Sequence, residues 1–577
     1  MNSISGKEKS LAARKLGSVL VMLLAMLWAS GSSAKQLPVF KLAKPEFDSS
    51  RAIAILESLR GRGTVSEIES EDQGNVFVAR AGSKEVEIYK ASGGVFMRDS
   101  KQLWNPELDP DLPSYDKAKV LADRFLASNK LLPSDDPHIR VSLAKFSETG
   151  VATDSPKQVN KKVLDIQANY RINVVIESAT GHKLVMPVVG GGGDFKVAIG
   201  DRGAVIGFLG VWRPIVDIAS TEEILPKARA EARFKKMAGN TNISKIRSFL
   251  AYYSAPAFER QNILAPVWVV MAEAKYGDHT VRLRNAIIAA TKYGPAWPDV
   301  PVKDRSQEEK PRPGSLDRDE RQQQSWLDRL IAPAFAQNPS EAGTSWIGPS
   351  QGLAGSPANA QGFVDGLAAG GWDINFNWGE QNAWESDWNS DDDNWVDATD
   401  FVFYTGHASS DGWVLNSPND TFLDFNEVGT TPGNPNDHYG QRDLEWIIIA
   451  ACGPHQSSHF VGGIGNAFDR WRGIFDGLHI FLGYGAVTFD NTTEGSRVVA
   501  LARSGWTVID AWFRAAWEIQ PSNNGYGAPD GPVIFVTAMY AKVGSQDTRN
   551  DHIWGAGSVA SDPRNPGQQR YLMWTGT

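Results

Sequence analysis

Two apolar runs in the C-terminal half of the chain each end at a residue with a reactive side chain. One covers residues 400–407 and ends at His407, and the other covers residues 444–452 and ends at Cys452. Both runs are continuous and rich in β-branched and aromatic residues, which favours strands buried on both faces of a parallel sheet. Open α/β folds bind ligands at the carboxyl ends of such strands. We therefore expect His407 and Cys452 at one edge of a sheet.

The segments around these two runs alternate between strand and helix patterns. This order predicts an α/β domain from residue 345 to 577, with a mostly parallel sheet covered on both faces. The further strands are expected at 345–347, 374–378, 479–484 and 533–539, and the helices at 357–369 and 496–517.

Residues 35–302 combine short strands with a few helices, which predicts a separate α+β region without a catalytic constellation. Ser220 with Glu223 matches a capping box and predicts a helix that continues to Met237. The sequence Gly-Ala-Val-Ile-Gly-Phe-Leu at 203–209, with the helix before it, resembles the PepSY-type domains found in propeptides of secreted bacterial peptidases.

A charged segment separates these two regions. Residues 303–329 carry seven basic and seven acidic side chains, with very few apolar residues. Such a composition cannot bury enough apolar surface to fold alone. We therefore predict a solvated linker at 303–344.

The N-terminus has the pattern of an export signal. Basic residues precede an apolar run from Val19 to Trp28, and the small residues Ser32, Ser33 and Ala34 follow it. Residues 1–34 are predicted to be a signal peptide cleaved near Ala34, with an uncleaved anchor as the alternative. The mature protein is expected to be secreted or periplasmic, without a membrane span.

Composition narrows the function classes. The 577 residues suggest roughly three or four domains, and the formal net charge of -9 argues against a nucleic-acid or anionic-membrane binder. Cys452 is the only cysteine, so an internal disulfide is excluded. It is either a reactive thiol or a buried and inert one.

The residues around the two candidates resemble those of the caspase-like cysteine peptidases, which include caspases, legumain, clostripain and the gingipains. The shared pattern is an apolar strand followed by His and a second one followed by Ala-Cys, which here reads Tyr-Thr-Gly-His-Ala at 404–408 and Ala-Ala-Cys-Gly at 450–453. The resemblance implies a three-layer α/β/α domain, His407 as the base and Cys452 as the nucleophile. It also implies an oxyanion hole from the backbone amides of Ala408 and Cys452, and no required cofactor.

The match has two departures. Ala408 stands where the family has glycine, and Cys452 lacks the flanking Gln and Gly of caspases proper. The resemblance therefore points to a separate secreted bacterial branch.

The sequence also suggests two rival sites. Cys452, His455 and His459 have a spacing that suits zinc, with His438 as a fourth ligand. The sequence Gly-Pro-Ser-Gln-Gly at 348–352 matches the nucleophile elbow of serine hydrolases.

The segment from 380 to 400 holds eight acidic residues and no Lys or Arg. Asp387, Asn389, Asp391 and Asp393 alternate like calcium ligands, although they do not match an EF-hand, so the alternatives are a calcium loop and a solvated acidic loop. The same acidity suggests selection of a basic residue before the scissile bond.

These observations predict an exported cysteine endopeptidase that acts on proteins or peptides, with the N-terminal region as an inhibitory or folding-assisting prodomain released at the linker. One alternative is a non-catalytic binding protein of the cell envelope on a decayed peptidase fold, because 14 of the 20 tryptophans lie from Trp346 onward. Another is a Cys/His zinc-site protein.

Overall fold

The computed structural model describes residues 36–45, 48–59, 67–133, 136–154, 160–177, 182–305, 340–416, 421–429, 438–525, 531–563 and 569–577. The signal peptide at 1–34 and most of the linker at 303–344 lie outside these residues. Both therefore stay predictions.

The C-terminal region is built on a mixed sheet in which five neighbouring strands are parallel. Their spatial order is β17 (Asp373–Gly379), β16 (Glu341–Trp346), β18 (Phe401–Thr405), β22 (Trp446–Ala450) and β23 (Ile480–Tyr484). The sheet continues through β24 (Phe535–Val543) and β26 (Gln569–Gly576), and β24 runs antiparallel to both of its neighbours. The mixed α/β character and the mostly parallel centre agree with the prediction.

Side chains of the central strands alternate between two buried cores. Phe403 and Ile448 contribute to the core that includes α7 (Ser356–Ala368), α9 (Glu494–Arg503) and α10 (Val508–Ile519). Tyr404 and Ile449 contribute to the core on the opposite face. The predicted burial of both faces is confirmed, and it explains why these strands read as continuous apolar runs.

The second face is covered by different elements from those expected. The loop after β17, the three short strands β19 (Ala408–Ser409), β20 (Gly412–Val414) and β21 (Phe422–Asp424), and the short helix α8 (Ala467–Trp471) supply its cover. The predicted helix at 496–517 is two helices, α9 and α10, separated by a turn in which Gly505 has a φ of +88°. Most of the C-terminal tryptophans fill these cores, including Trp378, Trp388, Trp413, Trp446, Trp471, Trp512, Trp517 and Trp574.

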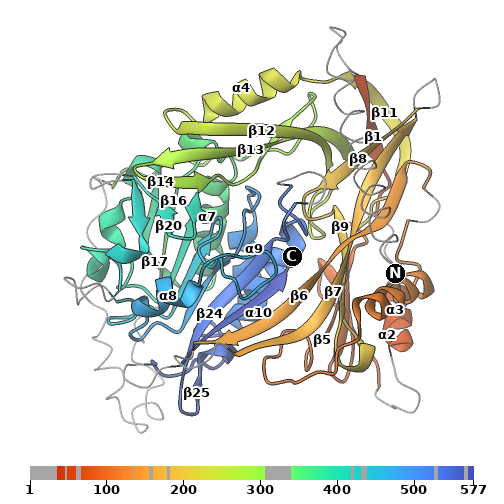
Figure 1. Cartoon of the computed structure of the whole chain (residues 1–577). Coiled ribbons are helices and arrows are strands. Elements are labelled where there is room, and N and C mark those ends of the chain that lie inside the picture. Colours follow the sequence, from red (N-terminus) through yellow and green to blue (C-terminus); the bar gives the residue numbers. More distant parts are fainter. Residues whose placement is uncertain are drawn as a thin grey trace, which may run out of the picture.

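The N-terminal region continues the same sheet. β6 (Ile139–Thr153) pairs with β26, and the ladder extends through β7 (Asn160–Glu177), β9 (Asp194–Ile199), β10 (Val205–Gly210), β5 (Val95–Asp99), β4 (Lys84–Tyr89), β3 (Val76–Ala81) and β2 (Glu69–Asp72). Helices α2 (Ser49–Ser58) and α3 (Tyr115–Ser128) pack on it. The two regions therefore share a hydrogen-bonded sheet (Figure 1).

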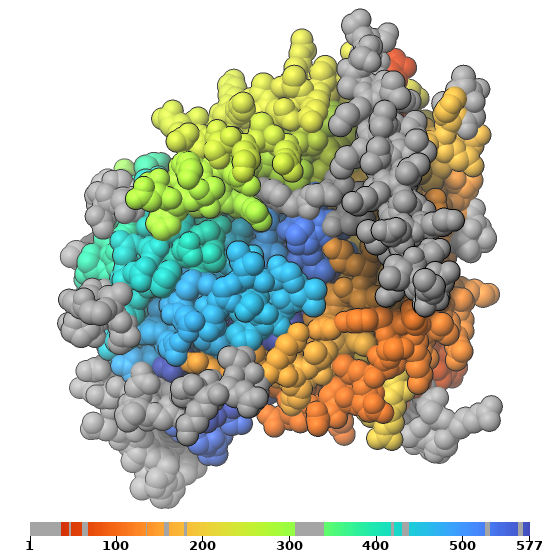
Figure 2. Space-filling view, in the orientation of Figure 1, coloured from red at the N-terminus to blue at the C-terminus, as the bar shows by residue number. Residues whose placement is uncertain are grey.

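A second group of strands reaches over the C-terminal region. It contains β1 (Gln36–Leu42), β8 (Lys183–Val189), β11 (Ile215–Glu223), β12 (Asn242–Tyr253), β13 (Ile263–Tyr276), β14 (His279–Arg282) and β15 (Ala286–Ala289). In Figure 2 the yellow-green surface of this group lies directly against the teal surface of the C-terminal region. The segment between β14 and β15 thereby reaches the edge of the parallel sheet.

The helix predicted from Ser220 begins later than expected. Ser220 and Glu223 belong to β11, and helix α4 (Lys227–Met237) begins after Pro226. The residue before a proline disfavours helical backbone, which overrides the capping-box pattern. None of the described helices has the length and apolar character needed to span a membrane.

A buried ion network also joins the two regions. Arg514 on α10 donates from Nη1 to Glu87 on β4 at 2.7 Å and from Nε to Glu518 at 2.9 Å. Arg497 also donates a hydrogen bond to Glu518, from Nη2 at 2.8 Å. The side chains of Glu87, Arg514 and Glu518 are almost entirely buried, so each of these charges depends on its partners.

The substitution Glu87→Gln should lower the free energy of unfolding by roughly 2–4 kcal/mol, because it leaves the buried Arg514 without one carboxylate. The double variant Glu87→Leu/Arg514→Met should recover most of this loss, since it removes both charges while Arg497 still compensates Glu518. Urea unfolding followed by tryptophan fluorescence measures both effects, with the exposed Glu69→Gln as control. Equal losses in the single and double variants would contradict the network's role.

Candidate functional site

His407 and Cys452 lie at the same edge of the parallel sheet. β18 and β22 are adjacent and parallel, and Thr405 at the end of β18 is paired with Ala450 at the end of β22. Each reactive residue follows its strand by two positions. The two segments that carry them therefore leave the sheet side by side, as the sequence predicts.

The imidazole of His407 is fully buried, and both of its ring nitrogens form hydrogen bonds. Nε2 lies 3.0 Å from the carbonyl oxygen of Gln351, and Nδ1 lies 3.2 Å from the backbone nitrogen of Arg284. A carbonyl only accepts and an N–H only donates, so Nε2 carries the proton and Nδ1 is the acceptor. Burial lowers the pKa of His407 to about 4, and the Gln351 carbonyl opposes this shift only in part. His407 is therefore neutral at pH 7.

Cys452 is also enclosed. Its Sγ accepts from the backbone N–H of Thr488 at 3.4 Å and lies 3.8 Å from the Thr488 hydroxyl oxygen. Burial raises the pKa of the Cys452 thiol above its usual value, against the smaller effect of the Thr488 N–H. In this state the sulfur is a thiol with low nucleophilicity.

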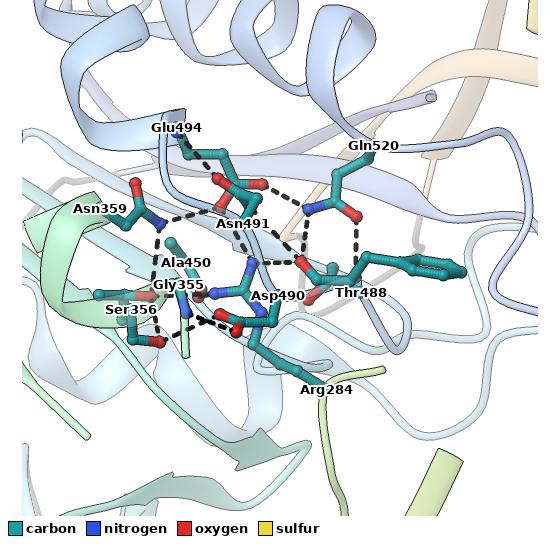
Figure 3. A network of polar contacts seen from close by, with 12 residues as sticks. Arg284, Gly355, Ser356, Asn359, Ala450, Thr488, Asp490, Asn491, Glu494 and Gln520 are labelled. Atoms are coloured by element: carbon teal, nitrogen blue, oxygen red, sulfur yellow. Dashed lines mark hydrogen bonds and ion pairs between the residues drawn. The ribbon is translucent and has the colours of Figure 1, made fainter. Parts of the chain in front are cut away.

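Arg284, from the segment between β14 and β15, reaches the same edge of the sheet and is fully buried. Nη1 donates to Thr405 Oγ1 at 2.9 Å and to the carbonyl of Ala450 at 2.7 Å. Nη2 donates to the carbonyl of Phe489 at 2.7 Å and to Glu494 Oε2 at 3.1 Å. Figure 3 shows the guanidinium inside this ring of acceptors. We call the site formed by Thr405, Ala450, Phe489, Asp490 and Glu494 the arginine pocket.

The arginine pocket is acidic. Glu494 also accepts at 2.6 Å from the Tyr484 hydroxyl and at 2.6 Å from the amide of Gln520. Burial raises the pKa of Asp490 to about 6, while the charge of Arg284 pulls it down. A cation in this pocket therefore compensates a buried carboxylate that would otherwise be costly.

The 348–352 segment has a different role from the elbow that its sequence suggests. Ser350 donates through its backbone N–H to Glu380 at 3.0 Å, and its hydroxyl bonds the same carboxylate. The short turn at Pro349–Gln351 presents the Gln351 carbonyl to His407. Sequence reasoning missed Gln351 because a backbone carbonyl leaves no signal in residue identity.

The proposed oxyanion amides lie beside the same edge. Ala408 begins β19 and is paired with Trp413, while the carbonyl of His407 accepts from the N–H of Val414 at 2.9 Å. Gly453 follows Cys452 with a φ of +76°, which favours glycine at that turn. The assignment of Ala408 and Cys452 to an oxyanion hole stays a prediction.

The four residues considered for calcium have separate partners. Asp387 accepts two hydrogen bonds from Arg305, at 2.6 and 2.7 Å, and Asp393 pairs with Arg442 at 3.0 Å. Asn389 donates to Glu385, and Asp391 accepts from Trp395 Nε1. The acidic segment thus pairs with two arginines of its own chain, and the structure does not gather these four side chains around one point.

The three histidines considered as zinc ligands also have separate partners. His455 Nδ1 lies 2.9 Å from the Thr537 hydroxyl, His459 contacts Ser457, and His438 lies 2.6 Å from the carbonyl of Gly473. Residues 452–466 form turns and loops without the helix that would align the histidines. Within the described ranges, Cys452 belongs to no group of three metal-ligand side chains.

Two acidic groups missed by sequence reasoning lie at the opposite edge of the sheet, before the strands begin. One consists of Glu341, Asp400 and Asp443, and the other of Glu445, His479 and Asp562. Five of the six residues lie just before or at the starts of β16, β18, β22 and β23, and Asp562 comes from the segment before β26. Sequence alone does not relate these positions.

A family model described as a domain of unknown function, DUF6345, matches residues 344–576. This match covers nearly all of the C-terminal region, including His407 and Cys452. Among solved structures, an uncharacterized protein from Eubacterium rectale is similar at 12% identity and a TM-score of 0.28, covering 44% of this chain and 85% of that chain. The curated proteins contain no match.

The buried neutral His407 should make stability fall in mild acid. Between pH 7 and pH 5 the unfolded chain protonates this histidine, whose ordinary pKa is near 6.5, whereas the folded chain does so only near pH 4. The unfolding free energy should drop by about 2 kcal/mol from this residue alone. His407→Asn should lose that part of the drop.

Chemical denaturation at pH 7 and pH 5 measures this difference. Burial also lowers the pKa of His455, to about 3, so that residue contributes equally to both proteins. The exposed His182→Asn is the matched control. An unchanged pH dependence in His407→Asn would contradict the burial of a neutral His407.

Proposed function

We propose that this protein is an exported cysteine endopeptidase of the caspase-like type, held in a latent state by its own N-terminal region. One observation carries the proposal. An oriented histidine and a cysteine follow adjacent parallel strands, and a backbone carbonyl fixes the imidazole with its Nδ1 lone pair turned toward the segment that bears Arg284.

The orientation of His407 suits a general base. The Gln351 carbonyl holds the proton on Nε2, which leaves Nδ1 free to accept a proton once the Arg284 amide departs. A base positioned by a third group is the usual requirement for activating a sulfur nucleophile. The mostly parallel centre of the sheet is consistent with the proposed fold, whereas the second face differs from it because short strands, loops and α8 cover that face.

In the proposed reaction, His407, Cys452 and the amide of Ala408 each have a defined role. His407 Nδ1 takes the proton of Cys452 Sγ, and the thiolate attacks the substrate carbonyl carbon. The oxyanion is held by the amides of Ala408 and Cys452, and the amine leaves with the proton from Nδ1. Water, deprotonated by Nδ1, hydrolyses the thioester and regenerates the thiol.

The latent state has a physical cause. The Arg284 N–H occupies Nδ1, the only acceptor nitrogen of the neutral His407 imidazole, and burial keeps the sulfur protonated. Hydrolysis therefore requires the segment between β14 and β15 to move away from the edge of the sheet. This role extends the inhibitory function expected for the N-terminal region.

A second candidate is a non-catalytic binding protein built on the same domain. It is favoured by the enclosure of both His407 and Cys452 and by the ladder between β6 and β26, which integrates the N-terminal region. In that case Arg284 is a permanent structural element.

The variant Arg284→Ala should separate the two candidates, because loss of the four guanidinium hydrogen bonds should release the segment whose backbone N–H covers His407. If the protein is a latent peptidase, iodoacetamide should alkylate Cys452 at pH 7 at least about tenfold faster than in the wild type, and casein should be cleaved. Cys452→Ala should abolish cleavage, and His407→Ala should lower it by at least about 100-fold. The exposed Arg282→Ala, at the end of β14 and two residues before Arg284, is the matched control.

Intact casein and peptides in the presence of an alkylated, accessible Cys452 would reject the peptidase and favour the binding protein. The alkylation readout is needed because it separates an inactive site from one that stays covered.

A further inference from the structure

The arginine pocket holds the side chain of one residue of this chain at the ends of β18 and β22, beside His407 and Cys452. The acceptors for its guanidinium all belong to residues 405–494, whereas Arg284 comes from the N-terminal region. The separations along the chain range from 121 to 210 residues. The pocket is therefore a feature of the C-terminal region, and Arg284 is its occupant.

The geometry of the acceptors suits a guanidinium. Two oxygens face Nη1 and two face Nη2, so the four bonds spread across a planar fork. A lysine ammonium is a compact point charge with three donors on a flexible four-carbon stem and does not span this set. A neutral side chain would leave Glu494 buried without a cation.

The pocket adjoins the proposed dyad. Thr405 and Ala450 stand two residues before His407 and Cys452, at paired positions of the two strands. A side chain that fills the pocket brings its own backbone to His407, as the 3.2 Å contact of the Arg284 nitrogen demonstrates. A ligand residue in this pocket would therefore lie next to the reacting bond.

The segment that carries Arg284 is bound in an unproductive way. Asn285 donates to the Thr488 carbonyl at 2.8 Å, and Asp490 donates to the Asn285 carbonyl at 3.0 Å, so residue 285 runs parallel to residues 488–490. The amide at His407 is that of Arg284 itself. In a substrate cut after the pocket residue, the base would face the amide of the following residue instead.

We infer that the arginine pocket selects an arginine side chain of a polypeptide substrate, immediately before the scissile bond, and that Arg284 is an intramolecular mimic of that residue. The inference rests on the proposed peptidase function. The selectivity for a basic residue that was expected from the acidic segment at 380–400 is thereby assigned to the arginine pocket instead. Asp387 of that segment already binds Arg305. A cavity of about 490 Å³, lined partly by Tyr253, Trp297 and Asp490, adjoins the pocket wall.

Binding can be tested without catalysis in the full-length variant Arg284→Ala/Cys452→Ala. N-acetyl-arginine methylamide, its lysine analogue and its neutral citrulline analogue are titrated by calorimetry. The arginine compound should bind at least about tenfold more tightly than either of the others. Adding Glu494→Gln should remove this preference, whereas the exposed Glu69→Gln should leave it unchanged.

Hydrolysis is then measured in Arg284→Ala with matched peptides that carry Arg, Lys or citrulline before the reporter group. Preferential cleavage after Arg supports both the inference and the peptidase. Selective binding without hydrolysis supports the pocket and rejects the proposed function. Cleavage without preference for Arg overturns the inference and leaves the peptidase, and equal or absent binding of the three compounds overturns the inference.

A variant that does not fold alone is refolded with ethylguanidinium or ethylammonium. Recovery of native tryptophan fluorescence with ethylguanidinium only supports a guanidinium pocket. Recovery with both cations to the same extent, or with neither, overturns it.

Discussion

The buried guanidinium of Arg284 is the interaction on which the state of this molecule depends. It compensates Glu494 inside the protein, and it binds the ends of β18 and β22 through Thr405 and Ala450. Removing an ion from such a site without replacement leaves an uncompensated charge, which is strongly unfavourable. The same residue places its backbone N–H on His407. Arg284 therefore both compensates the charge of Glu494 and covers His407.

The rest of the interface between the regions is too extensive for simple release of the N-terminal region. The ladder between β6 and β26 continues one sheet across both regions, and Arg514 with Glu87 adds a buried ion pair. Local movement of the segment between β14 and β15 would free His407 without breaking either contact. The proposed activation is therefore a local opening, which needs less free energy than separating the regions.

The strands of the site were predictable because their burial leaves a strong sequence pattern. The continuous apolar runs before His407 and Cys452 indicated strands buried on both faces, and parallel pairing then placed both residues at one edge. Arg284 was not predictable, since it lies 123 residues from His407 in a segment without a local motif. The same limit applies to Gln351, because its backbone carbonyl, not its side chain, accepts the hydrogen bond from His407. It also applies to the antiparallel direction of β24, which depends on the neighbouring strands.

The central claim is that a histidine-activated Cys452 lies beside a pocket for arginine that Arg284 now fills. Reaction of Arg284→Ala with peptidyl chloromethyl ketones ending in Arg, Lys or citrulline tests it most directly, with the adduct located by mass spectrometry. The account predicts a stoichiometric adduct on Cys452 with the arginyl compound, formed much faster than with the other two and lost in His407→Ala. An absent adduct, or one formed at the same rate with all three compounds, would contradict it.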